Sequence, residues 1–460
     1  MAGPSRGDLE AEIARLAGEV DRLTGELASR DERLKSLEVL VERLQRRGKR
    51  QAAPFSKGDP GLRPKRPGRK AGAVHGRHGH RAAPPVVDRE VDAPLPECCP
   101  GCGGGLDFEK WEEQFETELP KARPVVTRFR IGVGHCRDCK RRVQGRHPEQ
   151  TSDALGAAAA RIGPEARAFA HWLHFVLGLS FAKASSVLGR FGVPVTAGAL
   201  SSGAQSTGVA LVPTTMAITR AVRSSALVVM DETGWRIGGW GAWLWVATSR
   251  EHTVYNVAWG RSFEDATRLV PEDYKGTVVR DGYVVYRSYT QATHQTCLAH
   301  LCRRTVEMIE ADHPQGQSTP RQVKALLTEA LAARHLPDTE RAVEAERIRV
   351  ALDEVIDRPQ HCDPDRRLAK HLANERDALL TFLADPEIDA TNWRGEQAIR
   401  PAVVNRKVWG GNRTEAGAAT QSRMMTYFRT AAQQGLDPIA GLVALARAPT
   451  RHTISGLGLT

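Results

Sequence analysis

Two aspartates in this sequence each follow a short apolar run of the kind that forms a buried strand. Asp231 comes directly after residues 226–230, which read ALVVM, and Asp281 follows residues 277–279, which read TVV, after one intervening arginine. Two carboxylates placed side by side in a buried setting lose hydration and repel each other, so they need a counter-charge. A divalent metal ion would supply that charge. We therefore take the pair as a candidate metal site.

A third carboxylate is expected from a helix that packs against these strands. The segment 391–401 reads TNWRGEQAIRP, and either Thr391 or Asn392 can cap a helix that begins there. Glu396 falls in the early turns of that helix, and Arg400 lies four residues further on, where it can pair with the glutamate.

Three carboxylates are the ligands that two hard cations need. Mg²⁺ and Mn²⁺ prefer oxygen ligands, and two such ions about 3.5–4 Å apart can activate an attacking oxygen and stabilise a leaving one at phosphorus. We predict that Asp231 bridges the two ions and that Asp281 and Glu396 flank them. The alternative is that the aspartates are turn or cap residues and that Glu396 only pairs with Arg400.

The elements that would position these residues follow one another as strands, a helix and a further strand. The first strand ends at Asp231, and segments 233–239 and 241–249 follow around a glycine-rich turn. Residues 252–260 make a third strand. Ser262 then caps a helix at 263–270, and residues 276–282 form a fourth strand. This order is typical of a ribonuclease-H-like α/β domain. We predict a catalytic domain over 223–448, with a helical insertion at about 301–388.

Four of the eight cysteines form two CxxC pairs with the spacing of a zinc site. Cys99 and Cys102 form one pair, and Cys136 and Cys139 form the other, with 33 strand-like residues between them. Four thiolates close a tetrahedral structural site, and one Zn²⁺ would fold a module too small to fold alone. We predict a zinc-ribbon-like module at 97–148, in which Cys98 is an alternative ligand.

The N-terminal part of the chain has two different compositions. Apolar residues at alternating spacings of four and three over residues 9–44 predict a coiled coil at 1–47 that self-associates; one amphipathic helix docked on its own domain is the alternative. Residues 46–81 hold twelve basic residues and one acid, with recurrent glycine and proline. We predict a disordered basic linker at 48–96 that neutralises DNA phosphates or is merely solvated.

Residues 149–222 have a helical pattern. The piece 179–202 contains a glycine turn and Thr196 as an N-cap, as in a helix-turn-helix that reads a DNA groove, although two helices joined by a turn are also a generic arrangement. At the other end of the chain, residues 449–460 form a predicted tail.

The overall charge favours a polyanionic partner. The 460 residues carry a net charge of +11. No run approaches the roughly 18 apolar residues of a spanning helix, and no signal-peptide core is seen, which argues against a membrane and for a cytoplasmic protein.

Basic residues beside the predicted sites are candidates for DNA phosphate contacts. They are Lys140, Arg141 and Arg142 after the second CxxC pair, Arg303 and Arg304 in the segment CLAHLCRR, and Arg400, Arg406, Lys407 and Arg413 after the glutamate. In the same CLAHLCRR segment, Cys297, His300 and Cys302 suggest a second metal, but small apolar helix positions are the simpler interpretation, and His300 alone is a candidate to face the acidic residues.

These residues lie in stretches that resemble bacterial insertion-sequence transposases of family sixty-six. The shared stretches are the N-terminal coiled coil, the CxxC…CxxC module, MDETGWRIGG, VVRDGYVVY, CLAHLCRR and TNWRGEQAIRPAVVNRKVWGGNRTEAGA, in the right order over nearly the whole chain. The sequence departs from the family pattern at Trp393, Gly395 and Gln397, where asparagine, alanine and arginine are common.

The resemblance implies that Asp231, Asp281 and Glu396 are an acidic (DDE) transposase triad. It implies a multidomain α+β protein that binds terminal inverted repeats and target DNA near the bacterial nucleoid, cleaves and joins strands, and works with small accessory proteins. Two other functions remain open from the residues: a catalytically inactive DNA-binding derivative, and a ribonuclease-H-like nuclease without strand transfer.

Overall fold

The computed structural model divides into two units, residues 1–118 and 119–460. Within them it describes residues 7, 15–27, 30–31, 34, 83–119, 123–156, 161–311, 318–360, 362–448, 453–454 and 456–457. The predicted basic stretch 46–81, much of the predicted coiled coil and most of the predicted tail 449–460 lie outside these residues.

Residues 15–27 of the N-terminal unit are helical. The predicted seam residues Leu16, Val20, Leu23 and Leu27 are 46–62% exposed on this helix. An apolar stripe on an exposed helix agrees with the heptad pattern, and the coiled coil itself stays a prediction.

The strands expected between the two CxxC pairs are largely not found. A hairpin of two short strands, β1 (Val133–His135) and β2 (Arg142–Gln144), flanks the second pair. In the described residues from 103 to 132 the chain forms no strand, although its apolar and polar residues alternate. Alternation alone does not make a strand where no partner strand buries the apolar face.

Within the described residues 161–226, four helices precede the sheet: α2 (Pro164–Phe175), α3 (Phe181–Arg190), α4 (Ala197–Ala210) and α5 (Val212–Arg223). As predicted, Thr196 caps α4, because its hydroxyl accepts a hydrogen bond from the Ala199 amide at 3.1 Å. The turn between α3 and α4 contains Gly192, whose φ of +74° suits glycine.

The central sheet has five strands in the order β5-β4-β3-β6-β7. Their bounds are β3 (Leu227–Ile237), β4 (Trp240–Thr248), β5 (Thr253–Ala258), β6 (Thr277–Arg280) and β7 (Thr293–Thr296), with α6 (Phe263–Thr267) before β6 and the 3-10 helix η3 (Val284–Ser288) after it. Strands β3, β4 and β5 are antiparallel, whereas β3–β6 and β6–β7 are parallel. The predicted mixed α/β domain with a central sheet is thus confirmed.

Two details of the sheet differ from the prediction. The first strand does not end at Asp231 but runs on to Ile237, because residues 229–237 pair continuously with β4. A fifth strand, β7, was missed, since its sequence THQT is short and polar and has no apolar alternation.

Alternate residues of β3 face two different cores. Val228 and Met230 pack with residues of α6 and η3 in one core. Trp235 and Ile237 pack with residues of the helices α12 (Trp393–Trp409) and α13 (Glu415–Gln433) in another. This period of two places the side chains of successive residues 231 and 232 on opposite faces of the sheet.

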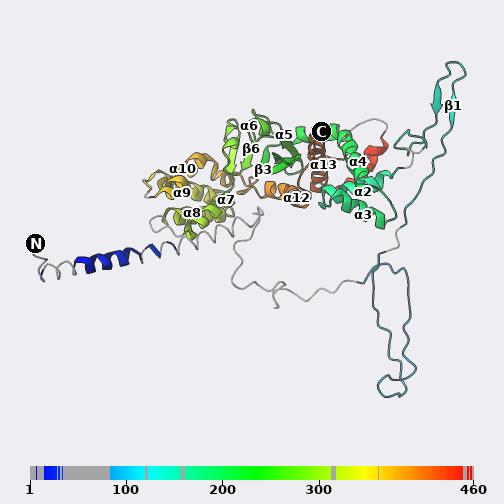
Figure 1. Ribbon diagram of the computed structural model, residues 1–460, viewed down its shortest axis with the longest axis horizontal. Helices are drawn as coiled ribbons and strands as arrows, with labels where there is room; N and C mark the ends of the chain where they lie inside the picture. The colour runs from blue at the N-terminus through cyan, green and yellow to red at the C-terminus, as the bar shows by residue number, and fades with distance from the viewer. Residues whose placement is uncertain are drawn as a thin grey trace, which may run out of the picture. The chain divides into compact units, whose positions relative to one another are not determined.

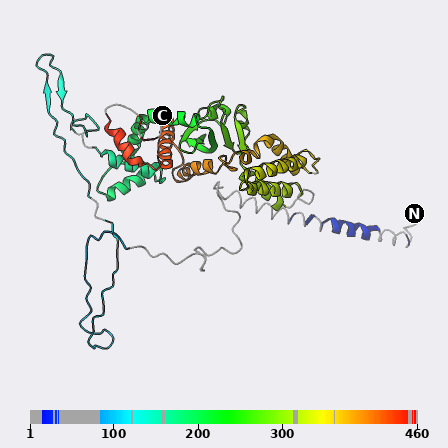
Figure 2. The same ribbon diagram turned by 180° about the vertical axis from the view of Figure 1, so that it is seen from behind.

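The segment after β7 is a helical subdomain, as expected. It contains α7 (Leu298–Glu310), α8 (Ser318–Ala333), α9 (Asp338–Asp357), α10 (Asp363–Glu375), η4 (Arg376–Ala378) and α11 (Thr381–Ala384). These elements share one apolar core that reaches Val229 and Val279 in the sheet. Figures 1 and 2 show this subdomain at one end of the sheet and α2–α4 at the other.

The C-terminal helices close the unit. Residues of α13 and α14 (Pro438–Arg447) share a core with α2, α4 and α5, so segments far apart in the sequence pack together. Gly435 follows α13 with a φ of +67°, and Asp437 caps α14 through the Ile439 amide. Within the described residues, we find no helix with the length and apolarity needed to span a bilayer.

Candidate active site

The parallel pairing of β3 and β6 aligns the two predicted aspartates. The last paired residues of this ladder are Val229 and Val279. Asp231 and Asp281 each come two residues after this pair, so that they occupy equivalent positions at the same edge of the sheet. The side-chain period of two puts the Asp231 carboxylate on the face where Val229 lies, and Asp281 follows directly after the last residue of β6.

Glu396 is brought to this edge by a close contact between α12 and β3. It lies in the first turn of α12, whose N-cap residue is Asn392. A Cβ atom at Gly395 would lie 3.3 Å from Asp231 Cβ and 3.2 Å from Val229 Cγ1. The absence of a side chain at Gly395 therefore lets the helix approach the strand beside the first aspartate, and the next residue along is the glutamate.

The charges of Asp281 and Glu396 act on Asp231. The pKa of Asp231 is raised well above its ordinary value, chiefly by burial and then by the charges of Glu232, Asp281 and Glu396, while a 2.9 Å hydrogen bond from the Glu232 amide opposes the shift. Like charges this close favour protonation of one of them unless a cation is bound. The arrangement is therefore suited to a divalent metal.

The loop after β6 holds Asp281 through a short turn. The Tyr283 amide donates to Asp281 Oδ1 at 2.9 Å. The preceding residue, Arg280, is 2% exposed; its guanidinium donates to the Asp281 carbonyl at 3.0 Å and forms an ion pair with the buried Glu375 of α10. The second aspartate is thus fixed from both the sheet and the helical insertion.

Glu232 is a buried acid that the sequence interpretation did not single out. It lies on the opposite face of β3 from Asp231, where its carboxylate accepts hydrogen bonds from Arg261 Nε at 2.9 Å and from the Tyr286 hydroxyl. Burial raises the pKa of Glu232, and these two donors oppose the shift. The alternation Val228, Met230, Glu232 could have shown that this acid points inward and needs a partner.

The Arg261 guanidinium is stacked on aromatic rings beneath the Asp281 loop. It lies 3.8 Å from the ring centre of Tyr283 and 4.5 Å from that of Trp243. The Tyr283 hydroxyl donates to the Arg261 carbonyl at 2.7 Å. The side of the sheet opposite the triad is therefore a rigid support for the turn that carries Asp281.

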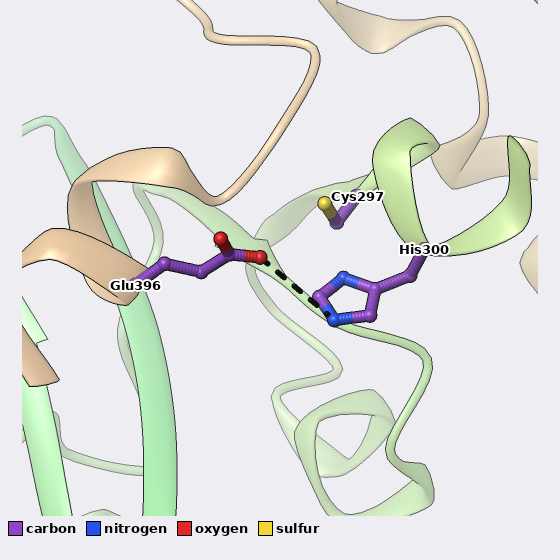
Figure 3. Close-up of side chains that lie close together, drawn as sticks. All are labelled: Cys297, His300 and Glu396. Carbon is purple, nitrogen blue, oxygen red and sulfur yellow. Dashed lines mark ion pairs between the residues drawn. The ribbon is translucent and has the colours of Figure 1, made fainter. Parts of the chain in front are cut away.

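The segment CLAHLCRR lies at the start of α7, beside the third acid. His300 Nε2 is 3.9 Å from Glu396 Oε1 (Figure 3), so this histidine does face the acidic residues. Cys302 is half-buried and packs against the apolar core of the insertion. Arg303 is exposed, whereas Arg304 is half-buried and its pKa is lowered by burial.

The basic residues after Glu396 lie in different settings. Arg400, Lys407 and Arg413 are exposed. Arg406 is half-buried, and its guanidinium donates to Thr233 Oγ1 at 3.4 Å and to the Gly234 carbonyl of β3. Arg406 therefore ties α12 to the sheet, and a DNA contact for any of these residues stays a prediction.

The two CxxC turns have the same backbone hydrogen bonds. In the first turn the Cys99 amide donates to the Gly104 carbonyl, and the Gly103 amide donates to the Cys99 carbonyl, both at 2.8 Å. In the second turn the Cys136 amide donates to the Arg141 carbonyl at 2.9 Å, and the Lys140 amide donates to the Cys136 carbonyl at 3.1 Å. The fourth residue after each first cysteine, Gly103 or Lys140, has a positive φ. Backbone amides within each turn lower the pKa of Cys99 and Cys136, as suits thiolate metal ligands.

The turn geometry favours Cys99 over Cys98 as the first ligand. We expect Cys99→Ser and Cys136→Ser each to lose about one zinc per chain, because a tetrahedral site needs all four thiolates. Cys98→Ser is the matched control and should keep its zinc. Metal analysis of the purified variants checks this, and equal zinc in Cys99→Ser and the parent chain would reject the ligand set.

The sheet order, the helices on both faces and three acids at one edge fit the class of ribonuclease-H-like α/β domains. A family model described as "Transposase IS66 family" matches residues 160–420, a span that contains the sheet, the insertion and all three acids. The chain belongs to this family and is, in general function, a transposase. No curated protein matches it.

Proposed function

We propose that the chain cleaves DNA at the ends of a mobile element and joins the freed ends to target DNA. The observation that carries the proposal is the placement of Asp231 and Asp281 two residues beyond one ladder pair, with Glu396 brought alongside by the glycine contact of α12. Three acids on neighbouring elements, two of which raise the pKa of the third, are most simply explained in a family of transposases as the reacting centre.

The acidic residues fit two Mg²⁺ or Mn²⁺ ions. Their donor atoms are hard oxygens, and the mutual repulsion that raises the pKa of Asp231 is the feature that a cation would relieve. When bound, such ions would polarise the scissile phosphate and lower the pKa of the attacking water or hydroxyl. Asp231, Asp281 and Glu396 would hold these ions through their carboxylate oxygens.

The reaction needs no covalent link to the protein. In the first step water attacks phosphorus at the element end and the bond from phosphorus to the 3′ oxygen breaks, which leaves a 3′-hydroxyl and a 5′-phosphate. In the second step this 3′-hydroxyl attacks a phosphorus of the target strand and displaces the 3′ oxygen there. The protein's part is to hold both DNA segments and the three carboxylates in line.

DNA is the proposed partner, and a net charge of +11 supports it. Terminal inverted repeats would be held by the exposed basic residues near the site and by Lys140, Arg141 and Arg142 on the β1–β2 hairpin, all three exposed. One structural Zn²⁺ at the four CxxC cysteines would order that hairpin region. Self-association through the predicted coiled coil and small accessory proteins of the same element complete the proposal.

A direct test uses the purified chain, a labelled element-end duplex and Mg²⁺. The expected products are a nicked end and, with target plasmid present, a joined molecule. Glu396→Gln should bind the duplex like the parent chain but give neither product. Cleavage without joining would favour a nuclease, and full activity in Glu396→Gln would reject the triad.

The neighbouring residues Arg406 and Lys407 give a matched pair for DNA binding. We expect Lys407→Gln to leave stability unchanged and to reduce the salt dependence of DNA binding by about one unit of slope, as loss of one phosphate contact would. Arg406→Gln should instead lower the free energy of unfolding by about 1.5–3 kcal/mol, because it removes a charged donor from β3. Urea unfolding and salt titrations of binding distinguish the two.

A further inference from the structure

Three side chains of metal-binding type meet between the start of α7 and the first turn of α12. The Cys297 sulfur, a His300 ring nitrogen and a Glu396 carboxylate oxygen all lie within 4.8 Å of one another. Figure 3 shows the thiol and the imidazole both near the glutamate carboxylate, the two coming from one helix and the carboxylate from the other. This set of donor atoms differs from the triad of Asp231, Asp281 and Glu396 because it contains a sulfur and a nitrogen.

The backbone around Cys297 is arranged to support a thiolate. Cys297 is the N-cap residue of α7, and the backbone amides of Asn392, His300 and Ala299 act to lower the pKa of its thiol. Amides at a helix N-terminus stabilise negative charge. The side chain is only 1% exposed, and burial raises the pKa of the thiol despite these amides.

Polar atoms around the cluster are left without partners in the described part of the chain. His300 Nδ1 is buried and makes no hydrogen bond there, and neither do the side-chain nitrogen and oxygen of Asn392, a residue that is 0% exposed. Buried polar groups in folded proteins are nearly always paired. Unpaired groups on both sides of the cysteine, together with the convergent thiol, imidazole and carboxylate, point to a bound ion.

We propose that Cys297, His300 and Glu396 form a Zn²⁺ site that takes its carboxylate from the acidic centre. Zinc bonds of about 2.3 Å to sulfur and about 2.0–2.2 Å to nitrogen and oxygen place tetrahedral ligands about 3.4–3.6 Å apart. The 3.9 Å between His300 and Glu396 is close to that separation. Thiolate and imidazole select zinc over magnesium, and the fourth position is open to water.

The shared glutamate makes the site regulatory. A Glu396 carboxylate drawn to zinc is withdrawn from Asp231 and Asp281, so that zinc should inhibit Mg²⁺-dependent cleavage. This consequence rests on the proposed function of the triad, whereas zinc binding itself does not. The cysteine and the histidine are needed only for zinc, and their loss should remove inhibition without removing cleavage.

The binding test uses the full-length chain and Co²⁺ as a spectroscopic probe. A Co²⁺–thiolate bond gives a charge-transfer band in the near ultraviolet. In Cys297→Ser the intensity of this band should fall by the amount that the Cys297 site contributes in the parent chain. The matched control is Cys302→Ser, on the same helix but outside the cluster, which should match the parent chain. Cys136→Ser removes the separate contribution of the CxxC cysteines.

A second variant protects the test against misfolding. The His300 side chain is 38% exposed, so His300→Gln should fold normally and show weakened Co²⁺ binding with a shifted band. Zinc analysis should likewise show one equivalent fewer in Cys297→Ser than in Cys302→Ser. Parent-like Co²⁺ spectra and zinc content in both Cys297→Ser and His300→Gln would overturn the site.

Inhibition of cleavage by zinc is tested separately from zinc binding. Zn²⁺ added to the Mg²⁺-dependent cleavage reaction should inhibit the parent chain and Cys302→Ser at least tenfold more strongly than Cys297→Ser. Zinc that binds at the cluster but inhibits all three equally would overturn the regulation. If the parent chain cleaves nothing, the proposed function fails, and the Co²⁺ and zinc measurements still decide the site.

Discussion

Asp231→Asn should lower the rate of DNA cleavage on the order of 10³-fold while making the metal-free protein more stable. The rate falls because one of the three carboxylates proposed to hold the metal ions loses its charge, and about 4 kcal/mol of transition-state stabilisation corresponds to that factor. The stability rises because the pKa of the buried Asp231 is raised by burial and by three neighbouring acids. An amide at this position carries no such cost.

The sign of the pH dependence follows from the direction of this pKa shift. Between the ordinary aspartate pKa of about 3.9 and its raised value in the folded protein, the folded state holds a proton that the unfolded chain has released. Stability therefore falls as pH rises through that window. The advantage of Asp231→Asn should be largest at neutral pH, vanish as the pH approaches 4, and shrink when Mg²⁺ is added.

Asp273→Asn is the matched control, since this aspartate is exposed in the turn before β6. It should change neither cleavage nor the pH profile. Thermal unfolding of the parent chain, Asp231→Asn and Asp273→Asn with and without Mg²⁺ tests the expected stabilities. A cleavage assay of the same three proteins tests the expected rates. A less stable metal-free Asp231→Asn protein at neutral pH would contradict the electrostatic account.

Much of the sheet could be predicted from the sequence because its buried strands are apolar and alternate. The runs before Asp231 and Asp281 are of this kind, and both lie in the sheet. The length of β3 could not be predicted, because Asp231, Glu232 and Gly234 are of residue types that are depleted in strands, and only the pairing with β4 extends the strand through them. Tertiary pairing overrides local preference there.

Part of the candidate site could likewise be predicted from the sequence, and part could not. Residue type and position pointed to Asp231, Asp281 and Glu396, and the ladder and helix contacts bring their elements together. The partners that hold them were not predictable, since Glu375 reaches Arg280 across 95 positions of sequence. No local pattern indicates which acid of a charge-rich helix will be buried against which arginine.

The helical insertion contributes directly to the position of the second aspartate. Two residues of α10 one turn apart reach the loop after β6: Glu375 pairs with Arg280, and the His371 ring packs so closely on Gly282 that a Cβ there would lie 2.6 Å from it. Arg287 adds a second cation to Glu375 at 3.0 Å. The residues on both sides of Asp281 are therefore held by the insertion.

Glu375→Leu should consequently lower the free energy of unfolding by about 3–5 kcal/mol, because it leaves the 2% exposed Arg280 guanidinium buried without a counter-charge. The neighbouring exposed Asn374 is the control, and Asn374→Ala should stay within about 0.5 kcal/mol of the parent chain. Urea unfolding followed by tryptophan fluorescence measures both. A Glu375→Leu protein as stable as Asn374→Ala would show that the pair is not buried in solution.

The double variant Arg280→Met, Glu375→Leu separates folding from positioning. It removes the buried Arg280 charge and leaves apolar side chains of similar size, while Arg287, whose side chain is 30% exposed, stays accessible to water. Most of the lost stability should therefore return. Cleavage should not return with it, because Arg280 no longer donates to the Asp281 carbonyl, a bond of 3.0 Å in the parent structure. If the double variant regained both stability and cleavage, the ion pair would serve only to join the insertion to the sheet. The hydrogen bond from the Tyr283 amide to Asp281 Oδ1 would then suffice to hold the carboxylate.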